Sequence, residues 1–178
     1  HLLISLYKVE NKKEKLEDFK TAISSTVRSI SNSEKIEVSF GNQTPKSEKN
    51  SIKLPELSQI NNKLNFDQIR AMADSKSLNF RFSDDKTFKE HEPVGNISKR
   101  LYKISEKIRC EKIGTSYFKG VKNNIEKFYQ ERLSGLDLKS SEDKIIESFE
   151  NYLRTKFLDF KNDSHVDKKL KSYKKDLN

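Results

Sequence analysis

The sequence is poor in the residues that mark several common protein classes. Its 178 residues include one cysteine, three histidines, five glycines, three prolines and no tryptophan. A single cysteine, Cys110, excludes a disulfide framework within the chain and is typical of a reducing compartment. The longest apolar stretch at the start, LLISLY, is too short to span a bilayer and lacks the features of a signal peptide. We therefore expect a cytoplasmic protein that does not enter the membrane.

Groups that carry metal or acid–base chemistry are also scarce. His1, His91 and His165 lie far apart, and no cysteine, histidine or carboxylate stands at ligand spacing from them. Cys110 has no evident base nearby and falls in a predicted helix, where a packed thiol is more common than a nucleophile. We predict no catalytic, cofactor-binding or metal-binding residue in this chain.

The segment SEKIRCEKIGTSYFKGVKNNI, Ser105 to Ile125, resembles a phosphate-binding loop but departs from it in every part. Such a loop has the pattern GxxxxGK[ST] and follows an apolar strand. Here five residues separate Gly114 from Gly120, Lys122 is displaced from the second glycine, and no hydroxyl follows it. The preceding apolar residues recur at helical spacing. We interpret the two glycines as positions that interrupt a long helix or pack tightly within it.

Charge is what the chain has in abundance. Lys and Arg number 36 against 27 Asp and Glu, which gives a formal net charge of +9. A basic chain invites a nucleic-acid interpretation. However, 29 of the basic residues are Lys and only 7 are Arg, and acidic residues are interleaved with them, as in KKEKLED. That interleaving is typical of solvated helix faces, so nucleic-acid binding is the alternative and not the leading hypothesis.

The spacing of apolar residues predicts a mainly α fold, a helical domain with a small two-stranded β element. Helices are predicted over about residues 16–30, over 65–75, from 97 onward with a continuation beyond Gly120, and over 145–157. Strands are predicted where apolar residues alternate, in KIEVSF (35–40) and SLNFRFSD (77–84), with 42–53 as a loop. Two isolated strands are marginally stable, so we expect them to pair and to lie on the helices.

Several short motifs occur in an order that resembles a known family. They are EVSFG, LPEL, ADSKSLNFRFSD and EKIRCEKIGTSYFKGVKNNI, within roughly Phe19 to Asn124. In this order and spacing they resemble the N-terminal region of the CobT family, subunits of the aerobic, ATP-dependent cobaltochelatase of cobalamin biosynthesis. The matching positions are Val38, Phe40, Gly41, Leu54, Pro55, Ala73, Asp74, Ser75, Leu78, Glu106, Arg109, Glu111, Gly114, Gly120, Val121 and Asn124.

The resemblance implies a function for the complete complex. In that family the enzyme inserts Co²⁺ into hydrogenobyrinic acid a,c-diamide, with a CobS-like AAA+ subunit hydrolysing ATP and a CobN-like large subunit holding the corrin. The resemblance also implies that ATP, Mg²⁺ and Co²⁺ belong to the complete complex. This chain itself lacks the DxSxS motif of the family's metal-binding C-terminal domain. We therefore expect a non-catalytic assembly or scaffold module; the alternative is a free-standing basic helical protein that binds nucleic acid.

The same resemblance divides the chain into three parts. Residues 1–13 are expected to be an N-terminal extension outside the family match, and residues 14–160 a CobT N-terminal-like helical domain. Residues 161–178 contain few apolar side chains and are predicted to be a basic tail or a frayed helix.

Four charged residues within the motifs, and Arg70 shortly before one of them, are candidates for a structural network or a partner contact. Glu106 and Arg109 lie at i, i+3 and can pair along a helix, while Glu111 lies further round it. Asp74 is predicted either to cap a helix end or to orient Arg70 four residues earlier. The prediction is an ion network on the surface or between helices, with a contact to a partner subunit as the second possibility.

Two further candidates lie where basic residues outnumber acidic ones, between residues 99 and 132. Lys103 and Lys107 are one helical turn apart on the predicted long helix. An acidic segment of a partner would be attracted to such a face over a distance of about 10 Å. Added salt would screen this attraction. These lysines are therefore the predicted contact for an acidic partner.

Overall fold

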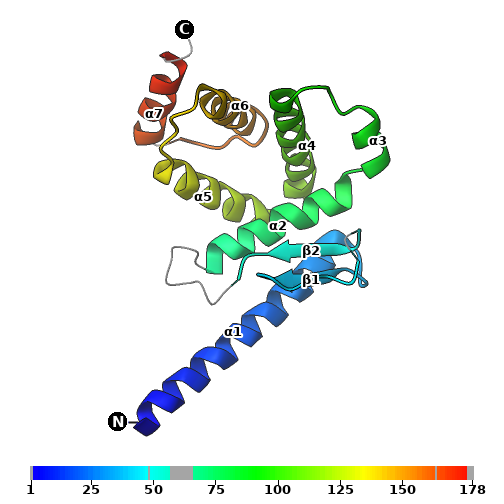
Figure 1. The fold of residues 1–178 in the computed structure, drawn as a ribbon, viewed down its shortest axis with the longest axis vertical. Coiled ribbons are helices and arrows are strands. Elements are labelled where there is room, and N and C mark those ends of the chain that lie inside the picture. Colours follow the sequence, from blue (N-terminus) through cyan, green and yellow to red (C-terminus); the bar gives the residue numbers. More distant parts are fainter. Residues whose placement is uncertain (1, 48, 57–65, 163, 176–178) are drawn as a thin grey trace. The chain divides into compact units, whose positions relative to one another are not determined.

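The computed structural model describes residues 2–47, 49–56, 66–162 and 164–175 (Figure 1). Within these residues the chain forms seven helices and a two-stranded sheet, so the predicted mainly α fold with a small β element is confirmed. The chain divides into two compact units, residues 1–77 and 78–178, and the division falls inside a helix. Each unit is described in turn.

The first unit begins with a long helix, α1, Leu2–Ser31. Ile23, Val27 and Ile30 lie at i, i+4 and i+7 along it and are buried, which is the single apolar stripe of a surface helix. α1 packs against the first strand of the sheet. The predicted helix over residues 16–30 is confirmed, and it continues toward the N-terminus through the segment expected to be an extension.

The sheet consists of β1, Glu37–Phe40, and β2, Ser51–Leu54, paired in parallel. Val38 lies opposite Ile52, and Phe40 lies opposite Leu54. Gly41 follows β1 with a φ of 62°, a left-handed conformation that suits glycine. The strand predicted over 35–40 is confirmed. The loop predicted over 42–53 is wrong at its end, because Ile52 and Leu54 pair with β1 and become buried.

The second predicted strand, residues 77–84, is wrong because α2, Phe66–Phe82, occupies most of it. Leu78 and Phe82 alternate with Phe80, but they also stand four residues apart and share a helix face. The hydroxyl of Ser77 donates to the carbonyl of Ala73 at 2.7 Å, a bond between successive turns of the same helix. Residue 65, where a helix was predicted to start, lies outside the described residues.

The second unit contains the predicted long helix as two pieces. α4, Asn96–Tyr117, is followed by α5, Lys119–Gly135, with Phe118 between them in an extended conformation. Before them lies a short helix that the sequence analysis did not predict, α3, Asp85–Glu90. Asp84 caps it by accepting a hydrogen bond from the Thr87 backbone N–H at 2.7 Å.

Two more helices complete the second unit. α6, Ser141–Phe157, is capped by Ser140, whose side chain accepts a hydrogen bond from the Asp143 backbone N–H. α7, Ser164–Lys175, buries Val166, Leu170 and Tyr173 on one face. α6 packs against α4 and α7, and α5 packs against α4 and α7. The region expected to be a basic tail or a frayed helix therefore includes a helix with its own apolar face.

The two glycines of the loop-like segment have different surroundings. Gly114 is buried inside α4, and a Cβ placed there would lie 2.6 Å from Leu78 Cδ1. Gly120, in the first turn of α5, has nothing within 4 Å of such an atom. Close packing therefore explains Gly114 but not Gly120, and the helix is interrupted at Phe118, between them.

Candidate functional site

In the first unit, Arg70 and Asp74 pair along α2. Arg70 Nε donates to Asp74 Oδ1 at 3.2 Å, and the Asp74 side chain is fully buried while that of Arg70 is 43% exposed. Asp74 lies in the interior of α2, so it orients Arg70 and does not cap a helix end. A buried carboxylate requires such a partner, because an uncompensated one would be expelled to water or protonated.

In the second unit, Glu106 and Arg109 form a bidentate pair on α4. Arg109 Nε donates to Glu106 Oε2 at 2.7 Å, and Arg109 Nη2 donates to Glu106 Oε1 at 2.8 Å. The same Nη2 donates to the carbonyl of Phe82 at 2.6 Å, which satisfies an orphan carbonyl at the C-terminus of α2. The Arg109 hydrogen bond is the main cause that lowers the pKa of Glu106. The pair thus fastens α4 to the end of α2.

Cys110 lies beside this pair and is buried. Burial, together with the nearby Glu106 carboxylate, raises the pKa of Cys110 to about 12. The thiol is therefore protonated at neutral pH, and a protonated thiol is a poor nucleophile and a poor metal ligand. Its packed position matches the interpretation made from the sequence.

Glu111, the third acidic candidate, is fully buried and meets an arginine that the sequence analysis did not single out. Arg154 Nη1, from α6, donates to Glu111 Oε2 at 2.7 Å. Arg154 also donates from Nε and Nη2 to Glu150 Oε1, at 2.9 and 2.8 Å. Its guanidinium lies over the Tyr129 ring, 4.7 Å from the centroid. One arginine thus connects α4, α5 and α6.

A second arginine extends this group. Arg132, on α5, donates to both oxygens of Glu147, at 3.0 and 2.8 Å, and to Glu150 at 3.2 Å. The Tyr129 hydroxyl donates to Glu147 at 3.0 Å. We refer to Glu111, Tyr129, Arg132, Glu147, Glu150 and Arg154 together as the buried ion network.

The charges around Glu150 keep this member of the buried ion network ionised. Burial alone would raise the pKa of Glu150, but the charges of Arg154, Lys107 and Arg132 together hold that pKa below its ordinary value. Burial raises the pKa of Tyr129, and Glu147 and Glu150 raise it further, so its hydroxyl remains a donor. The hydrogen bonds and ion pairs of the network fix the positions of α4, α5 and α6.

The two lysine candidates differ in their surroundings. Lys103 is exposed on α4, whereas Lys107 is half-buried and acts electrostatically on Glu150. Neither forms an ion pair within the part of the chain that the structure describes. Lys107 therefore helps to stabilise the Glu150 carboxylate, and Lys103 is the freer of the two to meet a partner.

Five members of the buried ion network were open to a sequence argument that was not made. Glu147, Glu150 and Arg154 stand at i, i+3 and i+7 of a predicted helix, so they share one face. Tyr129 and Arg132 stand at i, i+3 on the preceding helix. A row of alternating charge on one face is usually solvated, and nothing in the spacing shows that this row is buried instead.

Neither a phosphate cradle nor a metal cluster is present in the described residues. Thr115 and Ser116, between the two glycines, donate their hydroxyls to the carbonyls of Lys112 and Ile113 in their own helix. Across the described ranges, no three or more His, Cys, Asp or Glu side chains are grouped so that they could hold a metal ion.

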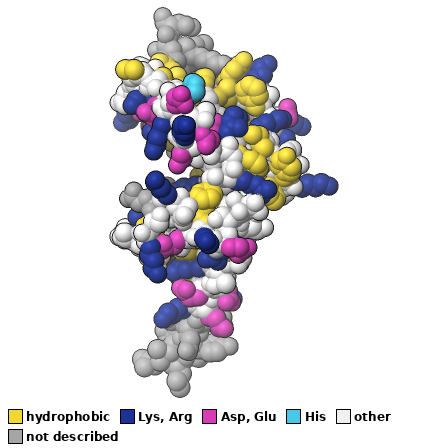
Figure 2. Space-filling model, turned by 90° about the vertical axis from the view of Figure 1, so that its right-hand side faces the viewer, with side chains coloured by type: hydrophobic (Ala, Val, Ile, Leu, Met, Phe, Trp, Pro, Cys, Tyr) yellow, Lys and Arg dark blue, Asp and Glu magenta, His cyan; other side chains and the backbone are white. Residues whose placement is uncertain are grey.

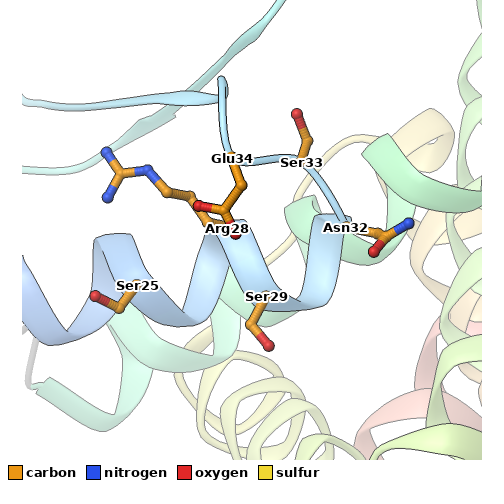
Figure 3. A pocket seen from close by; sticks show the side chains of 6 residues that line it. All are labelled: Ser25, Arg28, Ser29, Asn32, Ser33 and Glu34. Atoms are coloured by element: carbon orange, nitrogen blue, oxygen red, sulfur yellow. The ribbon is translucent and has the colours of Figure 1, made fainter.

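A polar pocket of about 490 Å³ lies at the C-terminal end of α1 (Figure 3). Its lining residues come from the end of the helix and the segment that follows: Ser25, Arg28, Ser29, Asn32, Ser33 and Glu34. Arg28 could attract an anion, but Glu34 in the same lining offsets that charge. The pocket contains none of the predicted candidates.

Comparison with known proteins gives one positive finding. A family model described as cobalamin biosynthesis protein CobT matches residues 13–151. The match includes Glu111, Glu147 and Glu150 but ends before Arg154. No solved structure matches the chain. Within the described residues, no helix is long and apolar enough to cross a membrane.

Proposed function

Because the chain belongs to the CobT family of cobalamin biosynthesis proteins, we propose that it is an assembly module of a subunit of the aerobic, ATP-dependent cobaltochelatase. In this proposal the complete complex works in the cytoplasm and inserts Co²⁺ into hydrogenobyrinic acid a,c-diamide. A CobS-like AAA+ subunit hydrolyses ATP with Mg²⁺, and a CobN-like large subunit holds the corrin. The module itself performs no chemical step; it positions the subunit for its partners.

This proposal rests on the contacts that the motif residues make. Glu106 and Arg109 pair with each other and fasten the end of α2, Glu111 pairs with Arg154, and Gly114 packs on Leu78. These positions carry the family resemblance, and each is engaged inside the second unit. Residues that a family uses to hold helices together support a scaffold, whereas a catalytic family would require polar groups that converge on an open cleft.

Lys103 is the candidate for the partner contact. It is exposed, and the arginines near it are engaged with acidic side chains of the same unit. Because Lys103 has no counter-ion among the residues that the structure describes, it is available to steer an acidic segment by long-range attraction. The opposing surface, on the CobS-like subunit or elsewhere in the complex, should therefore be acidic.

The test measures association and cobalt insertion with the full chain. The Lys103→Glu variant should bind the CobS-like subunit at least threefold more weakly at low salt and should slow cobalt insertion by the reconstituted complex, because an exposed charge contributes up to about 1 kcal/mol. The Lys139→Glu variant, which reverses an exposed lysine outside the helices, is the matched control. Equal binding by the parent and both variants would remove Lys103 from the interface.

Lys107 requires a milder change, because a carboxylate there would face Glu150. The Lys107→Gln variant should be tested separately, with its stability measured first. If Lys103→Glu leaves the chelatase subunits bound but abolishes binding to a labelled RNA of random sequence, the nucleic-acid alternative gains and the chelatase proposal for this surface fails.

The scaffold role also predicts what the chain does not do by itself. Calorimetry with ATP and with Co²⁺ should show no binding at micromolar concentrations, because the described residues contain neither a phosphate cradle nor a metal cluster. Micromolar binding of either ligand would contradict the scaffold role while leaving the family assignment unaffected.

A further inference from the structure

The helix α6 buries three charged side chains and exposes part of its apolar ones, although Ile146 is buried. Glu147, Glu150 and Arg154 are buried, whereas Tyr152 is 55% exposed and Ile145 is 38% exposed. Phe149 is half-buried between them. A surface helix ordinarily does the reverse, so this apolar row is left without the partner that its composition fits.

The neighbouring helix α4 has an apolar row of its own. Ile97 is 38% exposed, and Leu101 and Ile104 are half-buried. These residues stand at i, i+4 and i+7 and share one face. Ile108, at i+11 on the same face, is buried, so the row is open to the surface only over its first three residues. Phe88 stacks on Tyr102, which points to another side of α4, so α3 does not lie on the row.

The two helices run side by side in the same direction. Arg100, near the start of α4, pairs with Glu142 and Asp143 in the first turn of α6, at 3.2 and 2.9 Å. Further along, Glu111 of α4 pairs with Arg154 near the end of α6. The contact between α4 and α6 is therefore parallel and in step along about three turns of each helix.

Both apolar rows reach the surface on the same side of this helix pair. At about 100° per residue, the row of α4 is turned roughly 60° from the residues that face α6, and the row of α6 is turned roughly 110° in the opposite sense from those that face α4. In two parallel neighbouring helices, rotations of opposite sense about the helix axes direct both rows to the same side of the pair. We call this surface the α4–α6 apolar face: Ile97, Leu101, Ile104, Ile145, Phe149 and Tyr152.

The charges on this pair of helices are distributed unevenly. All six carboxylates of α4 and α6 are paired with arginines, and these acidic residues are Glu106, Glu111, Glu142, Asp143, Glu147 and Glu150. Lys112 and Lys156 are exposed and have no ion pair among the described residues. Negative charge is thus neutralised inside, and positive charge is left outside. Figure 2 shows hydrophobic and basic side chains next to one another at the surface.

The two lysines lie at one end of the α4–α6 apolar face. Lys156 is one turn beyond Tyr152, and Lys112 is two turns beyond Ile104 on the same side of α4. They lie at the same level, because Glu111 and Arg154, their near neighbours in sequence, are in contact. The surface therefore combines apolar side chains of two neighbouring helices with a positive end.

We propose that the α4–α6 apolar face binds an amphipathic helix of a partner protein, with acidic residues concentrated at the end that meets Lys112 and Lys156. The docking of an amphipathic helix by its apolar side is a common recognition mode, and the positive end of this face selects for the acidic end of such a helix. A second copy of this chain would bring lysine against lysine, which disfavours self-association. The inference does not depend on the proposed chelatase role.

The test uses the full chain and two fluorescein-labelled helical peptides of about 14 residues, a length of four turns. Both carry leucines at i, i+3, i+4 and i+7; one has three glutamates at one end, and the other has three lysines there. Anisotropy titration should show tighter binding of the acidic peptide. The Tyr152→Ser variant should weaken that binding about tenfold, the loss expected for one aromatic anchor.

Two variants serve as controls and sharpen the result. Tyr117→Ser removes a 70% exposed tyrosine on another side of α4 and should bind like the parent. The double variant Lys112→Glu, Lys156→Glu should prefer the lysine peptide, and this reversal should fade as salt is raised. Both variants change exposed side chains, so circular dichroism should show unchanged helix content.

The proposal is overturned by any of five results. The parent chain could fail to bind the acidic peptide, or bind both peptides equally, or bind unchanged when Tyr152 is replaced. Sedimentation could instead show a dimer of the parent that Tyr152→Ser dissociates, which would assign the face to a second copy. Tyrosine-dependent binding of a labelled polyuridine in place of the peptide would assign it to RNA.

Discussion

The helices α1 and α6 are both amphipathic, but they bury opposite kinds of side chain. α1 buries Ile23 and Val27 and exposes Glu17 and Asp18, whereas α6 buries Glu150 and Arg154 along with Ile146 and exposes Tyr152. Removing aliphatic surface from water is favourable against almost any apolar neighbour. Buried ions are stabilised only when a counter-charge sits at hydrogen-bond distance with the right geometry. The α1 contact should therefore accept substitutions that keep volume, and the α6 contact should accept only complementary ones.

The largest effect is expected from removing the central cation of the buried ion network. Arg154→Met leaves Glu111 and Glu150 buried with one counter-charge fewer, and it should lower the free energy of unfolding by about 4 kcal/mol. Urea denaturation followed by circular dichroism measures this. Arg154→Lys should also be costly, since one ammonium cannot reproduce bonds to two carboxylates. A loss below about 1 kcal/mol for Arg154→Met would mean that the carboxylates find water.

The aliphatic contact of α1 provides the counterpart. Ile23→Ala should cost about 3 kcal/mol through lost burial and the cavity left behind. Ile23→Leu keeps the volume and should cost less than about 1.5 kcal/mol. The contrast between α1 and α6 fails if Ile23→Leu proves as damaging as Arg154→Lys in the same urea assay.

A third effect, of intermediate size, concerns the two glycines. Gly114→Ala places a methyl group against Leu78 and should destabilise the chain by about 2 kcal/mol, the usual cost of overpacking. Gly120→Ala has open space and should stabilise by up to about 1 kcal/mol through helix propensity. Thermal unfolding of both variants compares them directly, and a destabilised Gly120→Ala would show that its position is not free.

The smallest effect is a pH dependence that α1 should not share. The folded-state pKa of Glu150 is below its ordinary value of 4.5, so its ionised form stabilises the fold above that pH. This contribution is lost as the pH falls through the lowered pKa. The stability of Glu150→Gln should therefore fall less steeply than that of the parent between about pH 6 and about pH 3. Parallel curves for the two chains would remove Glu150 from the acid response.

The spacing of apolar residues is enough to place most of the helices and β1, because helix and strand periods follow directly from backbone geometry. It fails over residues 77–84, where an alternation of three apolar residues fits a helix equally well and the continuation of α2 decides. It also misses β2, since Ile52 and Leu54 stand among polar residues and gain their burial only by pairing with β1.

The sequence points to the candidate residues more readily than to the side chains that they contact. Glu106 and Arg109 pair within one helix turn, so their spacing reveals the contact. Glu111 and Arg154 are 43 positions apart and meet only when α4 and α6 pack together. A single sequence contains no signal for such a contact, and the apolar row of α6 predicts the wrong face as buried.

Arg154 lies beyond residue 151, where the family match ends. This position limits how far the protein can be shortened at its C-terminus. A piece cut at that boundary would retain Glu111 and lose the guanidinium bonded to it at 2.7 Å. It would also lose Phe160, whose ring lies 5.7 Å from that guanidinium. Such a piece should express poorly, be degraded by proteases and form aggregates. The last residue of a minimal expression fragment therefore belongs after Phe160, whatever limit the alignment suggests.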